Sequence, residues 1–216
     1  MDEIPDLHTL RSKKVFVVHG RNADARQAMF DFLRSIELHP IEWSKARALT
    51  GEASPLIEKI LDAAFQNAQA VVVLFTPDEI IALRNEYANG VTDPDLTPAA
   101  QSRPNVFFEA GMAMGRDSRR TVLVELGTMR RFSDILGRHA LRIDNDPKKR
   151  HELALRLASA GCDIDITGQD WYTSGNFVIP PDLPEGLSLS PQPNSQTRSS
   201  VNAPDSNLRK RRREIR

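Results

Sequence analysis

Hydrophobic residues along the chain form short continuous runs, separated by longer stretches with helical spacing. Three of the runs, at residues 14–18, 70–75 and 121–126, have a continuous apolar centre, which is typical of strands buried on both faces of a sheet. Two further runs, at residues 40–43 and 140–143, are shorter and more polar. We therefore expect five strands, of which the two mixed ones are the less deeply buried.

The stretches between these runs predict four helices. Apolar residues recur there every three to four positions, as on the buried face of an amphipathic helix. Capping residues, first-turn prolines and terminal glycines indicate the boundaries. The predicted helices are residues 25–36 after the cap Asn22, 57–65 after Ser54-Pro55, 104–114 from Pro104 to a stop at Gly115, and 147–160 before Gly161.

Two segments lack a clear period. Residues 44–53 are predicted to form a polar loop. Residues 79–88 are compatible with a short helix, but Asn89-Gly90 and the prolines at 94 and 98 indicate a long irregular loop up to residue 103. Loops of this length in compact domains are usually functional lids or mobile segments.

The alternation of strands and helices predicts an α/β fold of the flavodoxin-like type, a five-stranded parallel sheet with helices on both faces. The expected strand order is 2-1-3-4-5, because the mixed second and fifth strands suit the edges of the sheet. We assign this domain to residues 14–179 and an N-terminal arm to residues 1–13. Residues 180–216 form a tail rich in proline and serine, whose composition predicts disorder.

Charge and composition narrow the possible functions. The formal net charge is zero, but residues 209–216 hold six bases and one acid, a net +5 that leaves −5 on residues 1–208. An acidic globular part argues against a dedicated nucleic-acid binder, and the basic end is either a solvated tail or a contact for an anionic partner. With one cysteine, no signal sequence and no apolar run near ~20 residues, we expect a cytoplasmic protein without membrane association.

The predicted sheet places a candidate ligand site at one edge. Ligands of open parallel sheets bind beyond the carboxyl ends of the strands, where the strand order reverses, and here that point lies between the first and third strands. The turns after these strands supply Gly20, Arg21, Asn22 and Thr76 as candidate nucleotide contacts. A helix start beside Arg21 suits a diphosphate. The glycine spacing of dinucleotide and P-loop fingerprints is missing, so neither a hydride-transfer enzyme nor an ATPase is indicated.

Glu109 is the expected reactive group on this edge. It is the single charged residue between Pro104 and Gly115, and it stands among Val106, Phe107, Phe108 and Met112. Because burying an unpaired charge is costly, such a carboxylate must be partly desolvated or face a cleft. The alternative is a surface glutamate of the first helical turn that complements the helix dipole. The five histidines are scattered along the chain, and no metal site is expected.

A receiver domain shares the predicted strand order. It would need an acidic pair after the first strand and a phosphorylatable aspartate that closes the third. The chain has His19-Gly20-Arg21-Asn22 and Thr76-Pro77-Asp78 at these places, so we set a receiver function aside.

Several ordered blocks together resemble one family. Over about residues 14–177 the chain resembles the TIR-like domain of bacterial antiphage effectors of the STING and Pycsar type, in which this domain is fused to STING or to cyclic-nucleotide-binding modules. Because 39 residues follow Phe177, neither module is expected here, and the activating signal stays open. The resembling blocks are residues 15–22, 54–57, 70–77, 103–115, 120–127 and 133–139.

The resemblance implies an NAD+ glycohydrolase of antiviral defence, with NAD+ as substrate and no cofactor. It places the catalytic carboxylate at Glu109, within the block Asn-Val-x-Phe-Glu-x-Gly, and further nucleotide contacts at Asp134 and Phe16. Trp43 and the loop after it occupy the region that contacts a neighbouring subunit in TIR domains, so a homo-oligomer is expected on activation. Trp43 is equally suited to packing on an edge strand.

One carboxylate suffices for the implied reaction. Nicotinamide leaves NAD+ as a neutral molecule, so no general acid is required, and a nearby negative charge stabilises the developing ribosyl oxocarbenium. Glycosidases with two carboxylates need the second one for a poorer leaving group. Two other functions stay open: nucleoside deoxyribosyl transfer, whose sites pair a glutamate with a Phe-Glu-x-Gly-like helix, and a non-enzymatic TIR adaptor.

Overall fold

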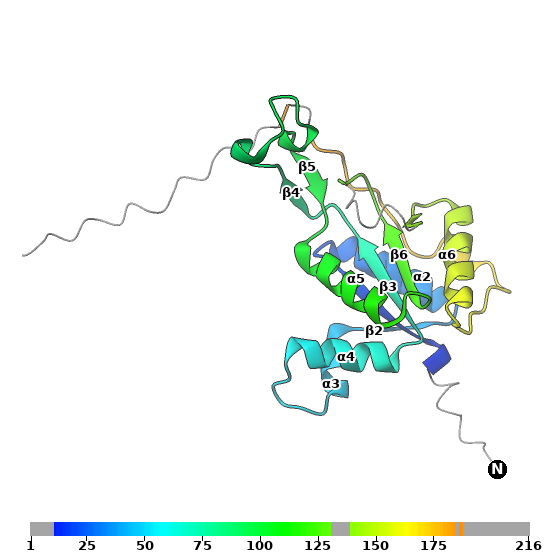
Figure 1. Ribbon diagram of the computed structural model, residues 1–216. Helices are drawn as coiled ribbons and strands as arrows, with labels where there is room; N and C mark the ends of the chain where they lie inside the picture. Colours follow the sequence, from blue (N-terminus) through cyan, green and yellow to red (C-terminus); the bar gives the residue numbers. More distant parts are fainter. Residues whose placement is uncertain (1–10, 131–138, 185, 188–216) are drawn as a thin grey trace, which may run out of the picture.

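A computed structural model describes residues 11–130, 139–184 and 186–187 (Figure 1). Its central element is a five-stranded, fully parallel sheet with the order β2-β1-β3-β6-β7. Since β6 and β7 are the fourth and fifth strands expected from the sequence, the predicted fold class and strand order are confirmed. The strands are β1 (Lys14–His19), β2 (His39–Ile41), β3 (Ala70–Phe75), β6 (Thr121–Glu125) and β7 (Leu141–Arg142).

Helices cover both faces of this sheet (Figure 1). One core joins α2, α6 and η4 to strand residues such as Val15 and Val17, and the other joins α3, α4 and α5 to the alternate residues Phe16 and Val18. The two layers bury the central strands completely, as their continuous apolar runs predict. The helices are α2 (Ala23–Ser35), α3 (Trp43–Leu49), α4 (Ile57–Asn67), α5 (Pro104–Asp117), α6 (Pro147–Ser159) and the 3-10 helix η4 (Asp170–Tyr172).

A small antiparallel hairpin between β3 and α5 stands away from the main body (Figure 1). Ile80 pairs with Ala100 across it, so the short helix considered for residues 79–88 is wrong. A β-branched residue suits a strand, and a run of three residues is too short to show an alternating pattern. The elements of the hairpin are β4 (Glu79–Ile81), η1 (Asn85–Tyr87), η2 (Pro94–Leu96) and β5 (Ala99–Gln101).

The polar loop expected at residues 44–53 is also wrong, because α3 occupies most of it. Ala46 is the fully buried residue of this helix, and the segment from Lys45 to Leu49 consists of strong helix formers. The edge strand β2 ends at Ile41, so Trp43 begins a helix instead of closing the strand.

Helix ends agree with the sequence where a side chain or a left-handed glycine fixes them. Asn22 caps α2 by accepting a hydrogen bond from the Ala25 amide (2.9 Å), and Gly161 follows α6 with a φ of 88°. The expected stop at Gly115 is wrong: its φ is not positive, and α5 continues to Asp117. The predicted cap at Ser54 is wrong by two residues, since Leu56 holds that position of α4.

Candidate active site

The turns after β1 and β3 meet through one carboxylate, that of Asp78. The Arg21 amide donates to Asp78 Oδ2 (2.8 Å), and the Thr76 hydroxyl donates to Asp78 Oδ1 (2.8 Å). Gly20 is needed beside them, because a Cβ there would lie 1.6 Å from Asp78 Oδ2. The structure therefore brings Gly20, Arg21 and Thr76 together at the carboxyl edge of the sheet, which we call the rim.

Asn22 contributes to the rim by capping α2, the helix that begins there. Its side-chain oxygen is engaged with the Ala25 amide, so it is not free to contact a ligand in this arrangement. The cap fixes the start of α2 directly after Arg21, whose side chain is exposed. Free amides at a helix start and an exposed guanidinium together suit an anionic group.

His19 ends β1 beside the same turn. Its Nδ1 is 2.8 Å from the Gly20 carbonyl oxygen, which can only accept, so Nδ1 carries the proton. Burial lowers the pKa of His19, and this effect together with the Arg26 charge outweighs the hydrogen bond to Gly20 and the Asp78 charge, which raise it. The side chain is therefore a neutral imidazole near pH 7, with Nε2 as an acceptor.

Glu109 lies in the second turn of α5, not in the first as in the surface alternative. The buried stripe of this helix, Val106, Ala110 and Ala113, packs against the sheet, and Glu109 stands on its flank. Arg116 shares that flank two turns later, and it lies over the ring of Phe65 in α4 (5.3 Å from the centroid). The flank that carries Glu109 therefore turns toward α4.

The Glu109 carboxylate is only partly exposed, and within the described part of the chain it has neither a hydrogen bond nor an ion pair. Burial raises its pKa to about 7, and no positive charge among the described residues offsets this effect. A carboxyl group that titrates near neutral pH without a structural partner is typical of functional sites.

Three contacts join the start of α5 to the rim. The buried Ser102 hydroxyl donates to the Thr76 carbonyl (2.8 Å), and Arg103 Nε donates to Glu79 Oε1 (2.9 Å). The ring of Phe107 lies 5.4 Å from that of Phe75 at the end of β3. Through these contacts, the turn after β3 is fixed to the helix that carries Glu109.

Two further sequence candidates, Phe16 and Trp43, belong to other parts of the fold than the two joined turns. The ring of Phe16 is 2% exposed and packs edge-on against Phe65 (5.7 Å), so it contributes to the core beneath α4. Trp43 is 41% exposed at the start of α3. Asp134 lies outside the described residues. Within the ranges that the structure describes, no three His, Cys, Asp or Glu side chains are grouped to hold a metal ion, and no helix is long and apolar enough to cross a membrane.

Residues 14–145 match the family described as the TIR domain of the CAP12/Pycsar effector protein. The chain belongs to this family. The matched segment contains all five strands of the TIR sheet and the whole of α5 with Glu109. The chain is also 29% identical over 155 residues to the uncharacterized protein YuaY of Escherichia coli strain K12. That match covers 71% of this chain and 48% of YuaY, so the chain spans about half the length of this curated relative.

The TIR rim includes residues that sequence reasoning did not select. Asp78 holds the two turns together, although the sequence only placed it near them. Ser102 and Arg103 precede the first-turn proline of α5 and fix the helix start. The signal that could have found them is their position next to predicted strand and helix ends, where side chains bond to free backbone groups.

Proposed function

We propose that this TIR domain is an NAD+ glycohydrolase in which Glu109 is the catalytic residue. The observation that carries the proposal is the Glu109 carboxylate itself, half-buried, without a partner in the described part of the chain, and with a pKa raised to about 7. Such a group favours a cation beside it, because a positive charge would offset its lost hydration. The nicotinamide ring of NAD+ and the ribosyl oxocarbenium derived from it are both cationic.

The reaction proceeds by heterolysis of the bond between nicotinamide and ribose. The bonding electrons leave with the nicotinamide nitrogen, which becomes neutral, and the positive charge moves onto the ribose. The Glu109 carboxylate stabilises this charge and orients water toward the anomeric carbon, which yields ADP-ribose, nicotinamide and one proton. The helix start after Arg21 would hold the diphosphate.

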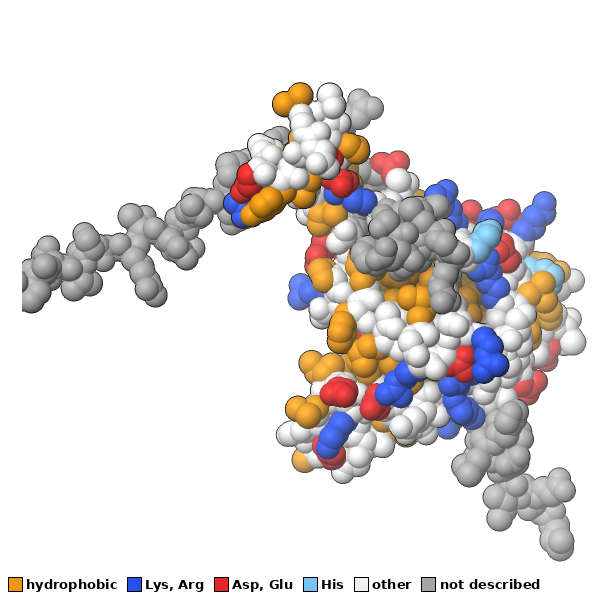
Figure 2. Space-filling model, viewed as in Figure 1, with side chains coloured by type: hydrophobic (Ala, Val, Ile, Leu, Met, Phe, Trp, Pro, Cys, Tyr) orange, Lys and Arg blue, Asp and Glu red, His pale blue; other side chains and the backbone are white. Residues whose placement is uncertain are grey.

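The proposed trigger is self-assembly, as part of an antiviral response. Hydrophobic side chains gather on the surface over α3 and α4 (Figure 2). Four of them on α3 and at the start of α4 are each at least 41% exposed: Trp43, Leu49, Leu56 and Ile57. An exposed apolar group of this kind supports contact with a second copy of the chain.

The test is release of nicotinamide from NAD+ by the purified protein, followed by chromatography at high protein concentration so that assembly can occur. Glu109→Gln keeps the shape of the side chain but removes its charge. We expect the rate of nicotinamide release to fall by about 10²- to 10³-fold, because a preorganised charge that stabilises the transition state is lost. Glu152→Gln is the matched control, because this glutamate lies on α6 at the opposite face of the sheet and pairs there with Lys149 and Arg156.

Equal rates for the wild type and Glu109→Gln would contradict the proposal. Exchange of bases between nucleosides, with NAD+ left intact, would instead indicate a nucleoside deoxyribosyltransferase. Cellular activity that survives Glu109→Gln but is lost on changing Trp43 would indicate a TIR adaptor.

A further inference from the structure

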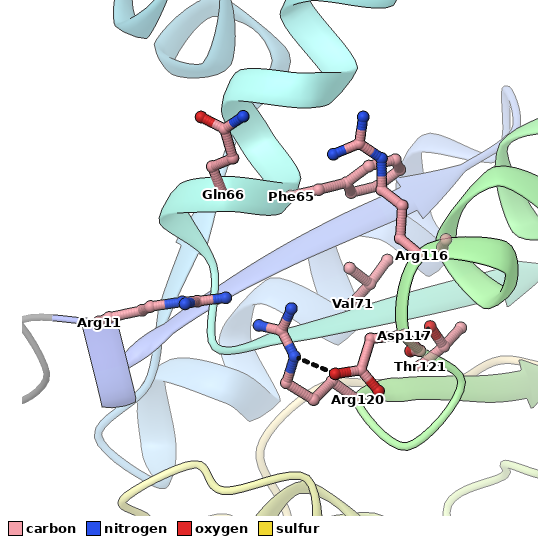
Figure 3. Close-up of a pocket in the computed structure, with 9 residues that line it drawn as sticks. Arg11, Phe65, Gln66, Val71, Arg116, Asp117, Arg120 and Thr121 are labelled. Carbon is pink, nitrogen blue, oxygen red and sulfur yellow. Dashed lines mark hydrogen bonds and ion pairs between the residues drawn. The ribbon is translucent and has the colours of Figure 1, made fainter.

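A pocket of about 360 Å³ lies at the opposite edge of the sheet from the rim (Figure 3). It is formed where β3 and β6 begin and where α4 and α5 end. Three arginines, Arg11, Arg116 and Arg120, line it together with the apolar side chains of Phe65 and Val71. The volume is in the range of small-molecule sites.

Two of the arginines meet at one backbone oxygen. Arg11 Nε donates to the Ala68 carbonyl (2.9 Å), and Arg120 Nη1 donates to the same oxygen (3.2 Å). In Figure 3 the guanidinium groups of Arg11 and Arg120 reach toward the same space from different elements. Burial lowers the pKa of Arg11 and the Arg120 charge lowers it further, while the Asp117 charge offsets part of this effect. The two like charges therefore oppose each other at the pocket.

Negative charge is scarce around these two groups. Among the described residues, Asp117 is the single carboxylate that lines the pocket. It accepts a hydrogen bond from Arg120 Nε (3.0 Å) and pairs with Arg119 (3.5 Å). Arg116 pairs with Asp62 of α4. Across residues 11–130 and 139–184, no carboxylate forms an ion pair with Arg11.

Capping of α4 explains only part of this arrangement. Ala68 is the C-cap of α4, and arginines that donate to a terminal carbonyl stabilise a helix end. That role uses one nitrogen of each guanidinium group on the Ala68 oxygen. The terminal nitrogens of Arg11 are left without a hydrogen bond to any described residue, beside a second positive charge.

We propose that this pocket binds the phosphate group of a nucleotide-sized ligand, with Arg11 and Arg120 as the residues that hold it. Guanidinium groups match phosphate oxygens in pairs, and an anion between the two arginines removes their repulsion. The apolar wall of Phe65 and Val71 takes the body of the ligand. Arg116, whose guanidinium lies 5.3 Å from the Phe65 ring centroid, offers a flat group on which a base can stack.

The inference does not rest on the proposed hydrolase activity, because the pocket and the rim lie at opposite edges of the sheet. Its test therefore measures binding alone. The full chain is titrated by calorimetry with inorganic phosphate and with AMP, at one fixed ionic strength. We expect both to bind, and AMP to bind at least about tenfold more tightly, because only AMP reaches the apolar wall.

Variants locate the site. Arg11→Gln is expected to weaken both probes by about tenfold or more, and Arg11→Lys by less, because it keeps the charge but loses the paired donors. Lys148→Gln removes an exposed positive charge from α6, away from both the pocket and the rim, and is expected to leave binding unchanged. Circular dichroism verifies that each variant is folded, and Arg120→Lys tests the second arginine without removing its charge from the end of α4.

Three results would overturn the inference. Binding of both probes by Arg11→Gln at the wild-type affinity would remove the pocket as the site. Equal weakening of binding in Lys148→Gln would show that the affinity reflects net charge and not the pocket. Equal affinities for phosphate and AMP would show that the apolar wall does not hold the body of a nucleotide.

Discussion

Gly20 and Asp78 pack so closely that a side chain at position 20 would have to displace the Asp78 carboxylate. A Cβ on residue 20 would lie 1.6 Å from Asp78 Oδ2 and 2.8 Å from its Cγ. The same carboxylate accepts the Arg21 amide and the Thr76 hydroxyl. The turns after β1 and β3 are therefore one unit, and a change in either turn moves the other.

Gly20→Ala should disrupt this unit. The added methyl group must displace the Asp78 carboxylate, which breaks its hydrogen bonds to Arg21 and Thr76. We expect the free energy of unfolding to fall by about 1–3 kcal/mol and NAD+ cleavage to fall by about tenfold or more. Chemical denaturation and nicotinamide release measure the two effects. Gly168→Ala is the control, since no atom lies within 4 Å of a Cβ at that position. Wild-type stability and activity in Gly20→Ala would contradict the packing described.

The pH dependence of NAD+ cleavage should report the pKa of Glu109. Because the carboxylate form stabilises the oxocarbenium, log kcat/KM is expected to rise with pH and to level off above about 7, where the raised pKa of Glu109 lies. The cationic nicotinamide ring favours the ionised form in the complex, so kcat should level off at a lower pH than kcat/KM. Light scattering at each pH controls for changes in assembly. A rate that falls as pH rises through 7 would instead indicate that the protonated form is active.

The sequence predicts the central sheet well, because each of its strands is marked by a local pattern. Continuous apolar runs mark β1, β3 and β6 as central, and the strand order then defines the rim. The sequence does not predict the hairpin of β4 and β5. Each of these strands has three residues, and they form because they pair with each other across a long loop. The hydrogen bond between Arg21 and Asp78 joins residues 57 positions apart, and no local period reveals it.

The site is less predictable than the sheet, because residue type does not fix burial. Glu109 is identified by its apolar neighbours in sequence, but its raised pKa depends on how α5 packs. Phe16 is a candidate whose burial argues against a contact with a ligand. An aromatic residue in the first strand suits a nucleotide contact, yet the alternation of the strand turns its ring into the core with Phe65.

Gly115→Ala tests the corrected end of α5. If Gly115 ended the helix in a left-handed conformation, alanine would strain the backbone. In the structure Gly115 lies inside the helix and is exposed, and no atom lies within 4 Å of the position that a Cβ would take. Alanine should therefore stabilise the protein by about 0.5–1 kcal/mol. Thermal or chemical denaturation measures this change, and Gly161→Ala, at a φ of 88° and with a Cβ 2.5 Å from Gln69 Nε2, should destabilise it.

Glu109 should also reduce the stability of the fold at neutral pH. Its pKa in the folded protein is raised to about 7, above its ordinary value of 4.5, so folding favours the protonated form. The stabilisation that this provides is fully present below about pH 4.5 and is lost as pH rises through about 7. Glu109→Gln cannot ionise, so the difference in stability between this variant and the wild type should be small at pH 4.5 and grow up to about pH 8.

The gain from Glu109→Gln at pH 8 is expected to be on the order of 1 kcal/mol, less than the full pKa shift implies, because water reaches part of the side chain. Urea denaturation of both proteins at a series of pH values measures it, and other titrating groups cancel in the difference. Glu58→Gln removes an exposed carboxylate from the neighbouring α4 and should change stability by less than about 0.5 kcal/mol. A Glu109→Gln variant that is less stable than the wild type at pH 8 would show that the carboxylate has a structural partner. A gain that coincides with lost NAD+ cleavage would mean that the site keeps an ionised, poorly hydrated carboxylate at the expense of fold stability.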